Sequence, residues 1–250
     1  MQEAQETFLS HLIELRQRLV RSLIAVGILL VPALYCSSEL YDILAQPLMR
    51  ALPPGAHMIA TGVITPFLIP MKISAMAAFL GALPYVLYQA WAFVAPGLYA
   101  HEKRLVLPLI VSSTVLFFAG MAFCYFVVFG RVFAFIASFA PQSISVAPDI
   151  EAYFNFVLGM FLAFGLAFEV PVVVVLLVLT GIINTAQLRE FRGYVVVAIF
   201  ALAAFITPPD AISMISLAIP MCLLYEAGII AAQLVERRRR QREAEAGGRD

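Results

Sequence analysis

Residues Tyr153–Leu179 read YFNFVLGMFLAFGLAFEVPVVVVLLVL, and Glu169 is the only charged side chain among these 27 positions. A helix needs about 20 apolar residues to cross the ~30 Å hydrocarbon core of a bilayer. The stretch therefore predicts a membrane-spanning α-helix.

Similar apolar windows recur along the whole chain, and their number decides the fold class. Of the 250 residues, 62% are apolar and 13% are charged, whereas soluble domains average about 45–50% and ~25%. In a water-soluble protein each of these helices would have to be buried on every side. We therefore expect an all-α polytopic membrane protein with one transmembrane domain over residues 1–250. Its six predicted spans are 19–36, 73–95, 105–129, 153–179, 194–206 and 211–235.

The last two predicted spans are short. Arg192 and Asp210 leave 17 uncharged residues between them, and Asp210 and Glu226 leave 15. At 1.5 Å per residue these lengths reach roughly 26 and 23 Å, so the bilayer thins locally or neighbouring helices cover the ends. One re-entrant hairpin is the alternative. It would bury the turn Thr207–Asp210, and we favour two short spans.

Prolines fall inside or at the edges of most predicted spans. Each proline removes one backbone hydrogen bond and bends its helix. Bent helices of unequal length favour a curved, concave bundle. The prolines concerned are Pro32, Pro84, Pro108, Pro171 and Pro220.

Basic residues set the orientation. With six spans, the N-terminus, the second and fourth loops and the C-terminus share one side of the membrane, which holds 13 of the 16 Lys and Arg residues. The other side holds Arg50, Lys72 and Arg131. By the positive-inside rule we expect both termini in the cytoplasm and the loops 37–72 and 130–152 outside. The net charge is zero, and we expect no nucleic-acid partner.

Two segments are predicted to lie at the membrane surfaces. In Glu39–Met49 the apolar residues recur at helical spacing, which indicates an interfacial amphipathic helix ending near Pro47. The run Arg237–Arg240 with Arg242 either anchors the last helix or binds anionic lipid or an acidic partner. We favour the anchoring interpretation.

Catalytic motifs are missing from the sequence. It contains no P-loop, no Gly-x-Ser-x-Gly and no His-Glu-x-x-His, and its three cysteines stand far apart. His11 and Glu14 are three residues apart and could share a metal, but they have no further ligands nearby in the sequence. We therefore expect no enzyme activity, no cofactor and no metal site. Any transport would draw its energy from the membrane potential or a proton gradient.

Glu169 is the most unusual residue of the predicted spans. An ionisable side chain inside a span is costly, and by default it marks a functional site that faces a cavity or a partner. Gly165, one turn earlier, leaves room beside it, and Pro171 frees the carbonyl of Ala167. The alternative is a carboxyl that is protonated or hydrogen-bonded for packing alone. We favour the functional interpretation.

Several motifs, in this order, resemble the TatC family, the multi-spanning signal-peptide receptor subunit of the twin-arginine protein translocase. The resemblance covers about Phe8 to Leu234 and includes the layout of six spans with two short final helices. The motifs are Ser10–Leu19 (SHLIELRQRL), Tyr88–Tyr99 (YQAWAFVAPGLY), His101–Arg104 (HEKR), Phe168–Pro171 (FEVP), Thr207–Asp210 (TPPD), and Pro220 with Tyr225–Glu226.

This resemblance implies a function. Family members bind twin-arginine signal peptides at their cytoplasmic face, assemble with single-span TatA- and TatB-like subunits as an oligomer of heteromeric units, and export folded proteins with the proton-motive force. Glu14 and Glu102 match the glutamates that contact the signal, with Arg16 as an organiser of that patch. Glu169 matches a buried glutamate where partner spans or an inserting signal hairpin dock. The expected location is the bacterial cytoplasmic (inner) membrane. Pro47, Phe93 and Asp210 match further positions associated with function.

Other kinds of membrane protein fit the sequence less well. A proton-coupled small-solute secondary transporter would use Glu169 near the midplane, but such transporters are usually built from paired halves with matching broken helices. The long first four spans do not map onto the short last two. A channel would need polar pore-lining stripes, which the apolar windows lack.

Overall fold

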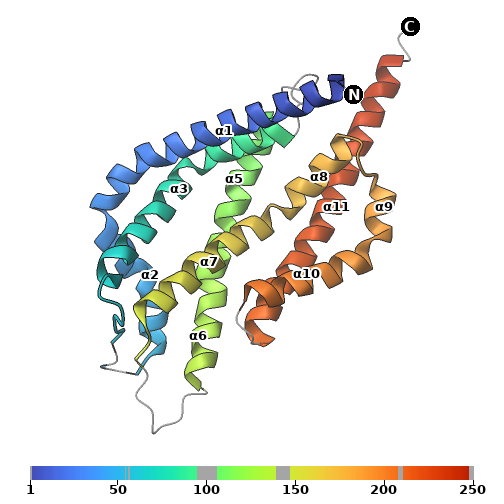
Figure 1. The fold of residues 1–250 in the computed structure, drawn as a ribbon. Helices are drawn as coiled ribbons and strands as arrows, with labels where there is room; N and C mark the ends of the chain where they lie inside the picture. The colour runs from blue at the N-terminus through green and yellow to red at the C-terminus, as the bar shows by residue number, and fades with distance from the viewer. Residues whose placement is uncertain are drawn as a thin grey trace. The chain divides into compact units, whose positions relative to one another are not determined.

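The computed structural model describes residues 2–53, 55, 57–94, 106–138, 147–207 and 211–247. Throughout this part of the chain the regular structure is helical, and the only strand-like feature is one isolated bridge between Ile59 and Asp149. Figure 1 shows the helices. They are α1 (Gln2–Tyr35), α2 (Ser37–Ala51), α3 (Thr65–Val94), α5 (Val106–Phe123), α6 (Phe129–Ser138), α7 (Ile150–Phe168), α8 (Val170–Leu179), α9 (Thr185–Glu190), α10 (Arg192–Ile206) and α11 (Ala211–Gly247), with a π-helical turn at Cys124–Val128.

The helices confirm the predicted class of polytopic α-helical membrane protein. Among the described residues, five segments are long and apolar enough to cross a bilayer, and the 15-residue α10 is a shorter apolar helix that brings the layout to the six predicted spans. The long segments are His11–Tyr35, Thr65–Phe93, Leu107–Ile136, Ile150–Leu179 and Ala211–Arg237.

The helices are longer than the apolar windows, because charged residues sit within them. Arg131 lies inside α6 and Lys72 inside α3, so these helices continue beyond the predicted spans, and the bounds of the outside loops 37–72 and 130–152 stay predictions. Glu226 does not interrupt α11, which continues from Ala211 to Gly247. The expected end of the amphipathic helix near Pro47 is wrong, since α2 continues through this proline to Ala51.

One of the prolines that were predicted to bend helices lies next to a break in its helix. Pro32, Pro84 and Pro220 lie inside continuous helices. Pro171, in contrast, follows a break of one residue between α7 and α8. The concave form of the bundle stays a prediction.

The chain divides into two compact units. The first comprises Met1–Thr114 and Ala140–Leu158, and the second comprises Val115–Phe139 and Gly159–Asp250. In the first unit α1 lies along α3 (Figure 1). Near one end of this pair the hydroxyl of Ser74 donates to the carbonyl of Ala33 at 3.1 Å.

The second unit depends on close approach of its helices. A Cβ at Gly120 of α5 would lie 2.4 Å from the carbonyl oxygen of Phe164 in α7. Conversely, a Cβ at Gly165 would lie 2.4 Å from the ring of Phe117. The two glycines therefore let α5 and α7 pack with their backbones nearly in contact. In the same unit α11 lies against α8 (Figure 1).

Candidate functional site

Glu14 is held at the junction of α1 and α3 by a chain of polar contacts. Arg18, one turn later on α1, donates from Nε at 2.9 Å and from Nη2 at 2.6 Å to Oε1 of Glu14. The Nη1 atom of Arg18 donates to Oε1 of Gln89 on α3 at 3.2 Å. Gln89 in turn donates to the hydroxyl of Tyr85 at 2.7 Å. The chain of contacts fixes the guanidinium of Arg18 and, through it, the carboxylate of Glu14.

The exposure of the two charged groups differs. The side chain of Glu14 is 42% exposed, whereas that of Arg18 is 22% exposed. An exposed pair four residues apart on a helix is worth only about 0.3–0.5 kcal/mol, so the pair adds little to stability. The contact instead holds the carboxylate of Glu14 in a fixed position at the surface. Arg18 covers only part of this carboxylate, and the rest stays accessible.

Phe93 and His11 lie in the same region. Their rings stack with centroids 4.3 Å apart and an interplanar angle of 21°. This contact joins the N-terminal half of α1 to the C-terminal end of α3. Arg16 is exposed on α1 between His11 and Arg18. The structure thus brings Glu14 and Phe93 into one region of the first unit, whereas Arg16, two residues after Glu14, points to another side of α1.

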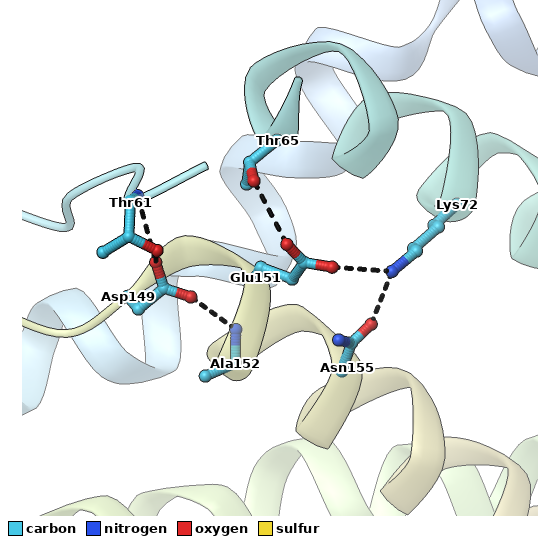
Figure 2. A network of polar contacts seen from close by, with 7 residues as sticks. All are labelled: Thr61, Thr65, Lys72, Asp149, Glu151, Ala152 and Asn155. Atoms are coloured by element: carbon cyan, nitrogen blue, oxygen red, sulfur yellow. Dashed lines mark hydrogen bonds and ion pairs between the residues drawn. The ribbon is translucent and has the colours of Figure 1, made fainter. Parts of the chain in front are cut away.

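A second polar network ties the other end of the first unit together (Figure 2). Asp149 accepts hydrogen bonds from the hydroxyl of Thr61 at 2.7 Å and from the backbone N–H of Ala152 at 2.9 Å. These bonds, the one to Thr61 first, hold the pKa of Asp149 below its usual value. Asp149 thereby caps α7 and fastens the segment before α3 to it.

Glu151 extends this network to α3. It accepts from the hydroxyl of Thr65 at 3.1 Å and pairs with Nζ of Lys72 at 3.5 Å. Nζ of Lys72 also donates to the side chain of Asn155 at 2.9 Å (Figure 2). Pro47 is half-buried in α2, and the carbonyl of Leu44, three residues earlier, accepts a hydrogen bond from the hydroxyl of Tyr153 at 2.6 Å.

Glu169 sits at the break between α7 and α8, and only 6% of it is exposed. Its backbone N–H donates to Leu166, and its carbonyl accepts from Val172 and Val173. Because Pro171 has no N–H, the helix cannot continue its regular bonding here. Gly228 of α11 packs against this break, since a Cβ there would lie 2.9 Å from Cα of Pro171. A carboxyl in the middle of an apolar span is thus enclosed beside a helix break.

Comparison with known proteins identifies the family. Residues 10–220 match the family described as "Sec-independent protein translocase protein (TatC)". The chain is 47% identical over 231 residues to the protein of that name from Haemophilus influenzae, covering 92% of this chain and 90% of the relative. It is 45% identical over 241 residues to that from Escherichia coli K12, covering 96% and 93%.

A solved structure agrees with these relatives. The "Crystal Structure of Twin Arginine Translocase Receptor- TatC" has a TM-score of 0.77 and 38% identity, and the match covers 90% of this chain and 98% of that one. The chain belongs to the TatC family.

Membership in the TatC family settles the broad function. The chain is a component of the twin-arginine protein translocase and an integral inner-membrane protein, and TatC proteins transport proteins without being enzymes. The small-solute transporter alternative therefore loses its support.

Only some residues of the family motifs lie in the described part of the structure. Glu102 and Asp210 lie outside the described residues. Arg18 and Gln89 were not singled out as site residues from the sequence, although both stand in the TatC motifs. For Arg18 the four-residue spacing from Glu14 is a usable signal. Gln89 offers no such signal, because its role depends on the pairing of α1 with α3.

Proposed function

We propose that this chain is the receptor subunit that binds twin-arginine signal peptides at the cytoplasmic end of α1 and α3, with Glu14 as one recognition carboxylate. The observation that carries the proposal is the accessible carboxylate of Glu14, fixed by Arg18 and Gln89. Arg16 is exposed on α1 two residues after Glu14, and we propose that it organises the basic rim of the patch.

Arginine suits this site better than lysine. A guanidinium is a planar fork that donates two parallel hydrogen bonds to a carboxylate, whereas an ammonium is a point charge. Oε1 of Glu14 already accepts two hydrogen bonds from Arg18, so the fork of a peptide arginine would donate both of its bonds to Oε2, as Arg18 does to Oε1.

One exposed contact cannot supply the selectivity. An exposed ion pair contributes about 0–1 kcal/mol. We therefore propose that Glu102 binds the second arginine of the pair and that the apolar part of the signal adds hydrophobic affinity. The exposed apolar side chains that continue along α1 beyond Arg18 offer such a surface, among them Leu19, Leu23 and Ile24.

The same proposal covers the partners and the orientation. Both termini face the cytoplasm, as the excess of basic residues on that side supports. TatA- and TatB-like single-span subunits dock near Glu169, the enclosed carboxyl at the α7–α8 break. The assembled heteromer exports folded proteins with the proton-motive force.

A binding measurement tests the recognition step. A synthetic signal peptide with two adjacent arginines and a matched peptide with two lysines are titrated against the purified full chain in detergent. We expect Glu14→Gln and Glu102→Gln each to weaken binding of the arginine peptide severalfold, and Glu14→Lys and Glu102→Lys to weaken it further. The arginine preference should nearly vanish when both glutamates are replaced.

The control is Glu39→Gln, an exposed glutamate on α2 that accepts a hydrogen bond from Ser38. It removes one negative charge far along the chain from the proposed site and should leave binding unchanged. A preference for arginine that survives replacement of both Glu14 and Glu102 would show that the arginines are read elsewhere.

A further inference from the structure

A polar cavity of about 270 Å³ lies in the second unit, between the short helix α9 and the far part of α11. Figure 1 shows these two helices side by side. The cavity is close to the lower end of the ~300–1,000 Å³ range of small-ligand sites. It is lined by Thr185, Ala186, Arg189, Gln233, Glu236 and Arg237.

The wall formed by α9 is held rigidly. Asn184 and Gln187 form a reciprocal cap at its start, with bonds of 2.8 and 3.0 Å. Leu188 is buried in an apolar cluster with Tyr225 and Ile229 of α11. The hydroxyl of Tyr225 donates to the carbonyl of Leu188 at 2.8 Å. The cavity is therefore preformed between two fixed walls.

The charges at the cavity favour an anion. Arg189 and Arg237 stand on opposite walls, both are exposed, and neither is bonded or ion-paired to another described side chain. Glu236 accepts a hydrogen bond from the hydroxyl of Thr185 at 3.1 Å. The neighbouring cation Arg192 is paired with Glu226 at 2.6 Å. The cavity is thus lined by two arginines and one carboxylate, and that carboxylate already accepts a hydrogen bond.

The cavity also lies at a defined depth along the helix. The apolar sequence of α11 ends at Val235, and Glu236 and Arg237 of the cavity wall follow it directly. The helix then continues to Gly247 through an arginine-rich sequence. The cavity is therefore placed where the polar headgroups of a bilayer begin.

We propose that the cavity between α9 and α11 binds the phosphate of an anionic phospholipid headgroup. Arg189 and Arg237 would donate charge-assisted hydrogen bonds to the phosphate oxygens from both walls, and Gln233 offers an amide donor between them. Basic pockets between membrane helices are suited to such headgroups. The inference does not depend on signal-peptide binding and goes beyond it.

The test titrates short-chain lipids into the purified full chain in neutral detergent and follows the rise in Tm that binding produces. The probes are dioctanoyl phosphatidylglycerol, dioctanoyl phosphatidylcholine and inorganic phosphate. We expect phosphatidylglycerol to bind more tightly than phosphatidylcholine. Arg189→Gln and Arg237→Gln should each weaken phosphatidylglycerol binding by roughly tenfold, the loss of one charge-assisted bond.

Matched variants separate the cavity from general charge effects. Glu236→Gln removes the carboxylate from the cavity and should tighten phosphatidylglycerol binding. Glu190→Gln removes an exposed carboxylate of α9 that is not part of the cavity wall and should change nothing. Arg50→Gln, which removes an exposed arginine of α2, should also have no effect.

Two outcomes would overturn the proposal. If Arg237→Gln weakens binding but Arg189→Gln does not, the arginine run binds the lipid and the cavity does not. If inorganic phosphate binds as tightly as phosphatidylglycerol and is equally sensitive to both arginine variants, the site serves a soluble phosphate and not a lipid.

Discussion

The guanidinium of Arg18 donates from both Nε and Nη2 to the same oxygen of Glu14, at 2.9 and 2.6 Å. Its third nitrogen reaches Gln89 on α3. Arg18 is therefore the residue that positions Glu14. The proposed site depends on Arg18, although Glu14 is the side chain that would bind the peptide.

Arg18→Lys should weaken binding of a twin-arginine peptide by roughly two- to fivefold. The substitution loses the fixed geometry of one partly exposed ion pair, which is worth about 0.5–1 kcal/mol. A lysine cannot donate to Glu14 and Gln89 through the same rigid fork. The preference for the arginine peptide over the lysine peptide should remain, since Glu14 is still present. Arg21→Lys, an exposed arginine further along α1, is the control. An equal loss in both variants would mean that only the overall basicity of α1 matters.

Two glycines in the second unit predict opposite effects of the same substitution. Gly120→Ala places a Cβ 2.4 Å from a backbone oxygen of α7, and the helices must separate. We expect a loss of about 1–3 kcal/mol and a lower Tm. Gly159→Ala on α7 meets nothing within 4 Å and should stabilise the helix by about 0.5–1 kcal/mol. Thermal unfolding in detergent measures both, and shifts of the same sign would contradict the close packing of α5 against α7.

The lowered pKa of Asp149 predicts a pH dependence of the Thr61 contact. A carboxyl whose pKa falls on folding adds stability above its unfolded value of about 3.9, and this stability is lost as the pH falls through the folded pKa. Thr61→Val removes the first cause of the shift. The Tm difference between the two proteins should be full at neutral pH and should shrink on acidification. In an Asp149→Asn background the effect of Thr61→Val should not depend on pH.

The sequence predicts the helices well because apolar length decides what crosses a membrane. It predicts their ends poorly, since hydropathy treats every charge as a boundary. Arg131 and Lys72 lie inside helices, and Glu226 is accommodated in α11 through its 2.6 Å pair with Arg192. That pair joins residues 34 positions apart, which no local pattern reveals.

The candidate sites divide in the same way. Glu14 and Glu169 stand out from composition and motif, and the spacing of Arg18 from Glu14 is local. Gln89 contacts Arg18 across 71 residues, and Thr61 contacts Asp149 across 88. Such contacts depend on which helices pack together, and a single sequence does not predict which helices these are.

The orientation of the chain is tested by labelling. In a variant with Cys36, Cys124 and Cys222 replaced by serine, His57→Cys and Glu190→Cys each introduce one exposed thiol. A membrane-impermeant maleimide added to intact cells should label the first and not the second. In inside-out vesicles the result should reverse. Labelling of position 190 in intact cells would place the α9 side outside and contradict a cytoplasmic receptor site.

Substitutions of Glu169 distinguish a residue that docks partner helices from one that serves only packing. Glu169→Gln keeps the shape of the side chain but replaces a carboxyl by an amide, so the fold around the α7–α8 break should persist with little change in Tm. If TatA- or TatB-like spans bind through this carboxyl, their association should fall by roughly tenfold, the loss of one hydrogen bond worth about 1.4 kcal/mol. Co-purification of the single-span subunits per folded molecule measures this association. Glu226→Gln, which alters another carboxyl within an apolar span that is already paired with Arg192, is the control and should leave association unchanged. Glu169→Ala should lower association at least as much. A Glu169→Gln protein that unfolds more easily yet retains its partners at the normal ratio would show that the carboxyl serves only the packing of the second unit.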